Sequence, residues 1–199
     1  DDTLELLPGY VLEGTINGGP NRANGRDTLV ISGGQPVLAS DLTTQFLGFE
    51  ALNIGTGATV TGELTAFESV DVSGTLALRM GSLVAEEAVF GPDSILEIEI
   101  GSDDHGRVEL GRLTIINGSK VRIVNTTKRT GTFDIVLFDE RVFEGTGPAP
   151  KFTIDYDDDD LVARLDYEES GIILNLSPAG GQQPESEDPQ EEEPGGNED

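Results

Sequence analysis

Short runs of alternating apolar and polar residues, separated by glycines, recur along most of this chain. Residues 93–124 read DSILEIEIGSDDHGRVELGRLTIINGSKVRIV, and apolar side chains occupy every second position of each run. A period of two is that of a β-strand with one buried face. Glycines at positions 101, 106, 111 and 118 stand where the chain is expected to turn between strands. The pattern predicts an all-β fold of short strands joined by frequent turns.

Two pairs of segments echo each other along the chain. DDTLELLPG at residues 1–9 recurs as RDTLVISGG at 26–34, and FEALNIGTG at 49–57 recurs as FESVDVSGT at 67–75. Aligning Asp2 with Asp27 and Phe49 with Phe67 gives offsets of 25 and 18 residues, the length range of one coil in a β-solenoid. We therefore predict a right-handed parallel β-helix of about six coils over residues 1–130. A β-sandwich is the alternative, because it also uses short strands and frequent turns.

The alternating runs also predict which side chains form the core of this β-helix. Each candidate is an aliphatic residue in the apolar phase of its run, so it should point inward. The candidates are Leu4, Leu29, Leu52, Ile54, Val70, Val72, Leu96, Ile98, Leu113, Ile115, Val121 and Ile123.

The composition changes twice toward the C-terminus. Residues 131–177 hold most of the aromatic side chains and four expected strands, TGTFDIVLFD, PKFTIDY, LVARLDY and GIILNLS, with turns at EGTGPAP and at DDDD. We expect this segment to be a β cap that covers the last open edge of the β-helix. Residues 178–199 carry many acidic side chains, no basic one and no aliphatic one except Ala, which predicts a disordered acidic Pro/Gly-rich linker or tail.

The charge of the chain excludes some kinds of partner. The formal net charge of −26 opposes general binding to nucleic acid or to anionic membranes. Without cysteine, the chain has no disulfides, thiolate metal sites or thiol catalysis. Half of the basic residues cluster within 23 positions, where they either offset neighbouring carboxylates, as we predict, or form a local anion-binding patch. They are Arg107, Arg112, Lys120, Arg122, Lys128 and Arg129.

Few residues suggest catalysis. The only histidine, His105, is flanked by Gly106 and has no G-x-S-x-G motif to accompany it, so we interpret it as a solvated turn residue. Glu97 and Glu99 fall on the same outward side of a strand, but like charges in water favour a solvated face over a glycosidase pair.

Two stretches resemble calcium sites in part. Asp155, Asp157 and Asp159 occupy the first, third and fifth positions of an EF-hand loop, and Asp166 the twelfth. Because Asp160 stands where that loop requires glycine, we predict a hairpin turn here. Only weak calcium binding at Asp155, Asp157 and Asp159 is left open. The stretch NGGPNRANGRDTLVISGG matches only half of a calcium-binding nonapeptide repeat. The sequence thus assigns no catalytic, cofactor-binding or metal-binding residue.

The same segments resemble a known family. DDTLELLPGYVLEGTINGG, GRDTLVISGG, FEALNIGTGATVTGELTAFESVDVSGTLAL and the strand-forming runs of residues 90–177 are similar to the passenger of a bacterial type V autotransporter of the pertactin-like β-helix kind. The similarity spans about residues 1–177 and is a pattern of Gly, Asp and aliphatic positions. It implies that residues 90–177 correspond to the C-terminal passenger region that nucleates folding.

The resemblance also implies a role and a location. Such passengers act as surface adhesins or stalks, so we expect a non-enzymatic, monomeric scaffold at the bacterial surface or secreted, with a host-cell or extracellular-matrix ligand as its possible partner. Contact with a membrane would be made only by a β-barrel that this chain does not include, and we expect the chain to be a fragment or a processed product. The alternatives are a solenoid polysaccharide-active enzyme and a calcium-stabilised secreted adhesin module.

Overall fold

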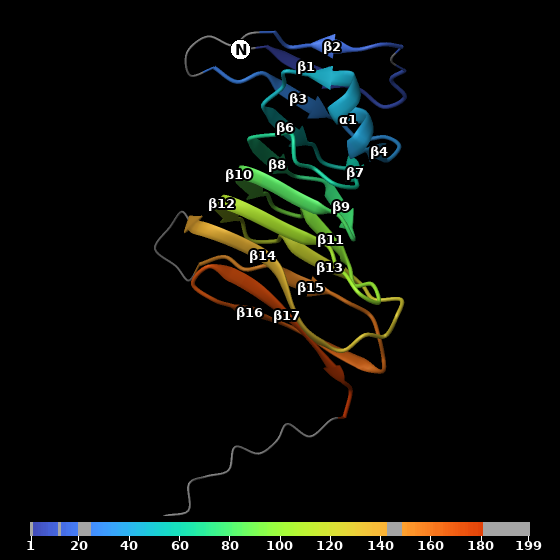
Figure 1. Ribbon diagram of the computed structural model, residues 1–199, viewed down its shortest axis with the longest axis vertical. Coiled ribbons are helices and arrows are strands. Elements are labelled where there is room, and N and C mark those ends of the chain that lie inside the picture. The colour runs from blue at the N-terminus through green and yellow to red at the C-terminus, as the bar shows by residue number, and fades with distance from the viewer. Residues whose placement is uncertain (1, 12, 20–24, 143–148, 181–199) are drawn as a thin grey trace, which may run out of the picture.

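The computed structural model describes residues 2–11, 13–19, 25–142 and 149–180. It consists mostly of β-strands in three sheets, with one short helix (Figure 1). Nearly all neighbouring strands pair in parallel. The structure therefore confirms the all-β class, and its parallel sheets differ from the antiparallel sheets typical of a β-sandwich.

The largest sheet contains nine strands. In spatial order they are β1 (Thr3–Leu6), β3 (Thr28–Ile31), β6 (Ala51–Ile54), β8 (Ser69–Val72), β10 (Ser82–Phe90), β12 (Arg107–Ile115), β14 (Gly131–Val142), β17 (Gly171–Pro178) and β16 (Leu161–Tyr167). The second sheet has six strands, in the order β15 (Thr153–Asp155), β13 (Lys120–Val124), β11 (Ile95–Glu99), β9 (Thr75–Arg79), β7 (Thr59–Thr61) and β4 (Val37–Leu38). The third pairs β2 (Ile16–Asn17) with β5 (Phe46–Leu47).

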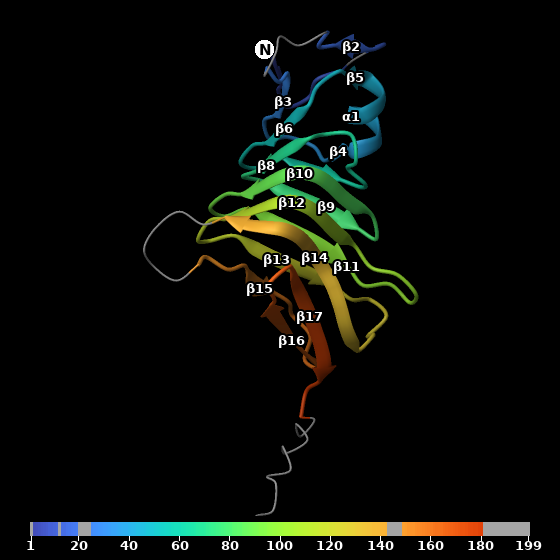
Figure 2. The ribbon, with the colours of Figure 1, turned by 60° about the vertical axis from the view of Figure 1, so that its left-hand side comes forward.

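The chain alternates between the two larger sheets as it proceeds. From β6 to β13 every strand of the nine-stranded sheet is followed by a strand of the six-stranded sheet, and we call each such pair of strands a rung. Successive rungs follow one another along the long axis of the molecule, from β1 near one end to β16 and β17 near the other (Figures 1 and 2). Position along the axis thus follows position in the sequence.

The register of the strands reproduces the echoes in the sequence. Thr3 pairs with Thr28, an offset of 25 residues, and Ala51 pairs with Ser69, an offset of 18 residues. These are the offsets obtained by aligning the echoing segments. The repeats are therefore neighbours in the sheet, and equivalent side chains lie on top of one another.

Aliphatic side chains fill the space between the two larger sheets. Eleven of the twelve predicted core residues are buried, and Leu4 in β1 is partly buried against the same cluster. One inward ladder joins Leu4, Leu29, Leu52, Val70, Ala88 and Leu113 through consecutive strand pairs. The assignment of inward-facing positions is confirmed.

One strand continues where the sequence analysis predicts a turn between strands. β12 continues through Gly111, and its buried positions shift from Val108 and Leu110 to Leu113 and Ile115 across that glycine. A Cβ atom at Gly111 would lie 2.8 Å from the carbonyl oxygen of Glu86 in β10. The prediction of separate strands here is wrong, because glycine lets one strand bend tightly against its neighbour.

The pairing changes at the C-terminal end. β17 pairs antiparallel with both β14 and β16, so two antiparallel strands follow the parallel stack. The aspartate run at 157–160 joins β15 of the six-stranded sheet to β16 of the nine-stranded sheet, so the predicted hairpin turn there is wrong. Pro178, where the sequence predicts the tail to begin, is the last residue of β17. Residues 144–148 of the predicted turn EGTGPAP and residues 181–199 of the predicted tail lie outside the described residues.

The helix α1 (Ala39–Gln45) follows β4 directly. Only Ala39 and Leu42 of its seven residues are buried, and no side chain caps its N-terminus. Two apolar residues three positions apart are too few to give a helical pattern in the sequence. No helix within the described ranges is long and apolar enough to cross a membrane.

Candidate functional site

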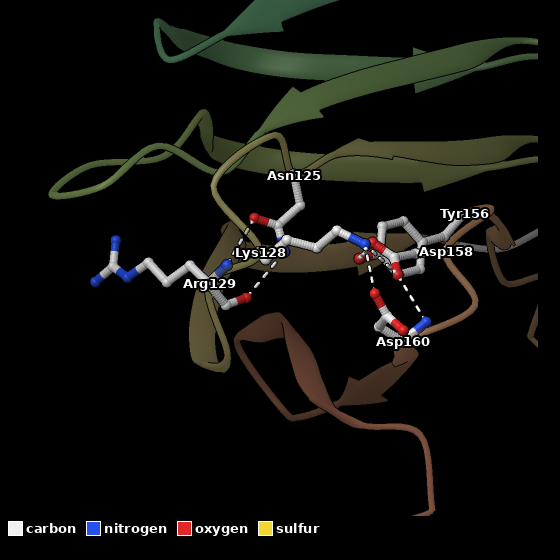
Figure 3. Close-up of polar contacts among 6 residues, drawn as sticks. All are labelled: Asn125, Lys128, Arg129, Tyr156, Asp158 and Asp160. Carbon is white, nitrogen blue, oxygen red and sulfur yellow. Dashed lines mark hydrogen bonds and ion pairs between the residues drawn. The ribbon is translucent and has the colours of Figure 1, made fainter.

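A polar cluster joins two loops at the C-terminal end of the molecule (Figure 3). Lys128 lies in the turn after β13, and its ammonium group is 3.0 Å from Asp158 Oδ1 and 3.0 Å from Asp160 Oδ2. The backbone N–H of Asp160 donates a 2.8 Å hydrogen bond to Asp158 Oδ1, and the Tyr156 hydroxyl lies 3.4 Å from Asp158 Oδ2. One ammonium group thus ties the turn after β13 to the crossover between β15 and β16.

The charges of this cluster stabilise each other. Hydrogen bonds from Lys128 and from the Asp160 backbone lower the pKa of Asp158 from its ordinary value. Hydrogen bonds to Asp158 and then Asp160 raise the pKa of Lys128. Both shifts favour the charged forms at neutral pH, so the cluster acts as an ion-pair contact and offers no group suited to proton transfer at that pH.

Asn125 holds the turn that carries Lys128. Its side-chain Nδ2 donates to the Arg129 carbonyl at 2.9 Å, and its Oδ1 accepts the Arg129 backbone N–H at 3.1 Å. Asn125 is buried. Lys128 lies between Asn125 and Arg129 in the sequence and has a φ of +54°. The two hydrogen bonds that join Asn125 to Arg129 help to fix this conformation.

The structure does not bring the candidate calcium ligands together. Asp155 binds Arg122 Nε at 2.9 Å, while Asp166 binds Arg164 Nε at 2.8 Å. Within the part of the chain that the structure describes, no group of three His, Asp or Glu residues could hold a metal ion. The EF-hand spacing of Asp155, Asp157 and Asp159 does not bring these carboxylates together, because β15 ends at Asp155 and its carboxylate binds Arg122. Residues 20–24 of the partial nonapeptide match lie outside the described residues.

Charges on the six-stranded sheet also pair across rungs. Glu97, Arg122 and Asp155 are directly opposite one another in β11, β13 and β15. Arg122 lies between the two carboxylates, 3.5 Å from Glu97 Oε2 and 2.9 Å from Asp155 Oδ2. Glu97 and Glu99 do face outward together, as the sequence predicts, but the neighbour that contacts Glu97 is an arginine.

A second network runs along the nine-stranded sheet. Arg26 Nη1 lies 2.7 Å from Glu87, and the same guanidinium is 3.6 Å from both Glu68 and Glu86. Arg112 in β12 then lies 3.8 Å from Glu87 and 3.3 Å from Glu140 of β14. These contacts join residues up to 61 positions apart, so no local motif in the sequence reveals them.

The basic residues of positions 107–129 mainly contact carboxylates or the backbone. Arg107 pairs with Glu109, Arg112 with Glu140, Arg122 with Asp155 and Lys128 with Asp158. Arg129 lies over the ring of Phe133, 5.0 Å from its centroid. The pairing supports the interpretation that these residues offset neighbouring carboxylates.

His105 forms an isolated antiparallel bridge with Ile100, beside the start of β14, and is partly buried. Its Nε2 is 3.2 Å from the carbonyl oxygen of Asp134, and its ring packs edge-on against Phe133 at 5.5 Å. The polar contact and the ring contact together orient the imidazole. Neither contact places a nucleophile beside it.

No family model and no curated protein matches this chain.

Proposed function

We propose that this chain is a right-handed parallel β-helix that serves as a rigid, non-enzymatic scaffold, either a stalk or the support of an adhesin. The observation that carries the proposal is the unbroken parallel pairing from β1 to β14, in which each rung matches the next. Stacked rungs of this kind form a rod whose length grows by about 4.8 Å with each rung.

The surface chemistry supports the same role. Glu97, Arg122 and Asp155 bind one another across three strands, and Arg26 and Arg112 each contact carboxylates on two or more neighbouring segments. Cross-strand pairs of opposite charge contribute modestly to sheet stability. Side chains used in this way stiffen the junctions between rungs.

The proposal extends to the setting in which such a rod would work. We infer a segment of a type V autotransporter passenger, exposed at the bacterial surface or secreted. The support for this is the sequence pattern together with two architectural features that suit a passenger, a parallel stack and an antiparallel C-terminal end.

Removing one rung tests the scaffold directly. Deleting residues 51–68 takes out β6 and β7 and brings Ser69 into register with Thr28, because Ala51 pairs with both. We expect a cooperatively folded protein. Spin labels on cysteines introduced at Glu5 and Glu140, both exposed, should move closer by roughly one 4.8 Å rung spacing.

The control is a deletion of residues 51–69, which is one residue longer and brings Val70 instead of Ser69 opposite Thr28, so the inward-facing Val70 and Val72 would fall in the outward phase of the sheet. It should lose its cooperative transition. Equal folding of the two deletion variants would contradict the scaffold proposal, as would release of reducing sugars from a polysaccharide panel by the intact chain.

A further inference from the structure

Arg79 differs from the other arginines that the structure describes. In that part of the chain, it is the one arginine whose side chain makes no ion pair, hydrogen bond or ring contact. The others are held by carboxylates or aromatic rings: Arg26, Arg107, Arg112, Arg122, Arg129, Arg141 and Arg164. An unpaired guanidinium is unexpected in a chain of net charge −26, where carboxylates are abundant.

The backbone at Arg79 is also unusual. It follows a β-bulge, because Ala77 pairs with Glu97 and Arg79 with Ile98, which leaves Leu78 as the extra residue. The turn is closed by the Gly81 N–H, which donates to the Leu78 carbonyl at 2.8 Å, and Arg79 has a φ of +55°. Glycine is the residue that adopts this φ without strain. Bulges and left-handed residues of this kind re-aim side chains and gather at binding sites.

The neighbouring coil fixes the conformation of this turn. A Cβ atom at Gly106 would lie only 2.1 Å from the Arg79 carbonyl oxygen, so the two backbones are in close contact. Leu78 is buried beside the turn, whereas the Arg79 side chain is exposed. The turn therefore presents the guanidinium from a rigid base.

Arg79 lines a hollow of about 690 Å³ between α1, the end of β7 and the end of β9. α1 supplies Ser40 and Thr43, whose side chains lie three positions apart on one helix face. The segment from β7 toward β8 supplies Thr61, Glu63 and Thr65. Hydroxyl groups therefore line much of the hollow, with one cation and one carboxylate.

Apolar surface completes the lining. Leu38, which is 52% exposed, and Ala66 both border the hollow. A volume of this size lies in the range that small-molecule sites occupy. The combination of hydroxyls, a carboxylate and a small apolar surface matches the hydroxyl and C–H faces of a sugar ring.

We propose that this hollow binds a carboxylate-bearing sugar unit of a glycan, with Arg79 holding the carboxylate. A guanidinium binds a carboxylate through two parallel hydrogen bonds, and Arg79 is the one cation among the described residues that line the hollow. Glu63 balances the single positive charge, which disfavours a phosphate dianion or a polyanion and suits a ligand with one negative charge and many hydroxyls. This binding role goes beyond the scaffold proposal and does not depend on it.

The test compares two disaccharides that differ in one group, cellobiuronic acid and cellobiose. Titration of the full chain, followed by amide chemical shifts in solution, should show saturable binding of cellobiuronic acid with the largest shifts at residues 61–66 and 79. Cellobiose and sodium acetate should each bind at least tenfold more weakly. No saturable binding of cellobiuronic acid, or acetate binding as tight as the acid sugar, would overturn the proposal.

Two variants at Arg79 separate binding from folding. Arg79→Gln should weaken binding of cellobiuronic acid at least tenfold. Arg79→Gly removes the same group and relieves the positive φ, so it should melt at the same temperature as the wild type or higher and still lose binding. Arg164→Gln, which changes an exposed arginine in β16, is the matched control and should bind normally. Retained affinity in either Arg79 variant would show that the guanidinium is not the anchor.

Discussion

The two ends of the molecule differ in how their outermost strands are covered. At the N-terminal end β1 is the edge of the nine-stranded sheet, and its Leu4 is only partly buried. Its equivalents Leu29 and Leu52 in the next two strands are 0% and 1% exposed. At the C-terminal end β17 and β16 continue the sheet in antiparallel pairing. In the edge strand Leu4 is thus less buried than its equivalents, although Leu6 of the same strand is 5% exposed.

Aromatic packing adds to the difference between the ends. Phe152, just before β15, packs edge-on against Phe90 of β10 at 5.2 Å, although the two are far apart in sequence. Phe133 of β14 is buried and contacts both Arg129 and His105. The Phe152 backbone N–H also donates to the hydroxyl of Tyr167 in β16 at 2.7 Å, which ties this region to the antiparallel strands. We infer that residues 94–177 form the most stable unit and template the earlier rungs.

The largest expected effect is from truncating these rings. Phe152→Ala should lower the free energy of unfolding by about 3–5 kcal/mol, the usual cost of removing a buried aromatic ring, and slow refolding of the whole chain. Leu4→Ala should mainly loosen the first strand, because Leu4 is already partly exposed. Urea denaturation and stopped-flow refolding measure both. Equal destabilisation by the two substitutions would contradict the proposed difference between the ends.

Amide hydrogen exchange addresses the same difference without mutation. Amides in residues 94–177 should exchange more slowly than those in residues 2–60, since strands at an open end open locally at lower free energy. Protection in the N-terminal rungs that matched or exceeded that in 94–177 would remove the basis for C-terminal templating.

Tyr167 provides a pH-dependent test of the C-terminal end. Its hydroxyl oxygen accepts the Phe152 backbone N–H at 2.7 Å, and burial raises its pKa from 10.0 to about 12. The folded chain therefore holds the phenolic proton more tightly than the unfolded chain. Stability contributed by this group is complete below pH 10 and is lost as pH rises from 10 to about 12.

The expected loss across that range is about 2–3 kcal/mol, at roughly 1.4 kcal/mol for each pKa unit. Tyr167→Phe cannot ionise, so its unfolding free energy should fall less steeply between pH 10 and 12 than that of the wild type. The variant should also be slightly less stable at neutral pH, because the Phe152 N–H loses its acceptor. Parallel pH dependences in the two proteins would show that Tyr167 does not contribute to the alkaline loss.

Much of this architecture could be predicted from sequence, for identifiable reasons. Inward positions such as Leu29 and Ile98 follow from the period of two, and the register of β1 with β3 follows from the repeated D-T-L. α1 could not be predicted because two buried residues give too weak a periodic signal. The Lys128–Asp158 contact spans 30 residues and depends on how the last crossover folds, so no spacing rule reveals it. The same holds for Arg79, whose position beside α1 depends on a bulge.

A smaller effect is expected at the polar cluster of Lys128. Lys128→Met removes the partner of Asp158 and Asp160 and should lower the melting temperature by about a few degrees at neutral pH, because the lysine is 55% exposed but the Asp158 side chain that loses its cation is only 8% exposed. Lys120→Met, at an exposed position in β13, is the matched control. Because the pKa of Asp158 is lowered in the folded chain, the stability from the pair is present above the ordinary aspartate pKa and is lost as pH falls through the lowered value. The difference between wild type and Lys128→Met should therefore disappear in strong acid, and a constant difference down to pH 2 would contradict this assignment.

The smallest effect is expected from shortening the chain at its acidic end. Removing residues 181–199 should leave the melting temperature within about one degree, because a segment without any aliphatic residue contributes little burial. Removing residues 178–199 should cost more, since Pro178 pairs with Leu161 and the Ala179 N–H donates to the Asp160 carbonyl at 2.7 Å. The second cut thereby removes the last residue of β17 and frees the crossover that carries Asp158 and Asp160. Differential scanning calorimetry of the two truncated chains measures this contrast, and a fall of several degrees already in the shorter truncation would show that the acidic residues bind the body of the molecule.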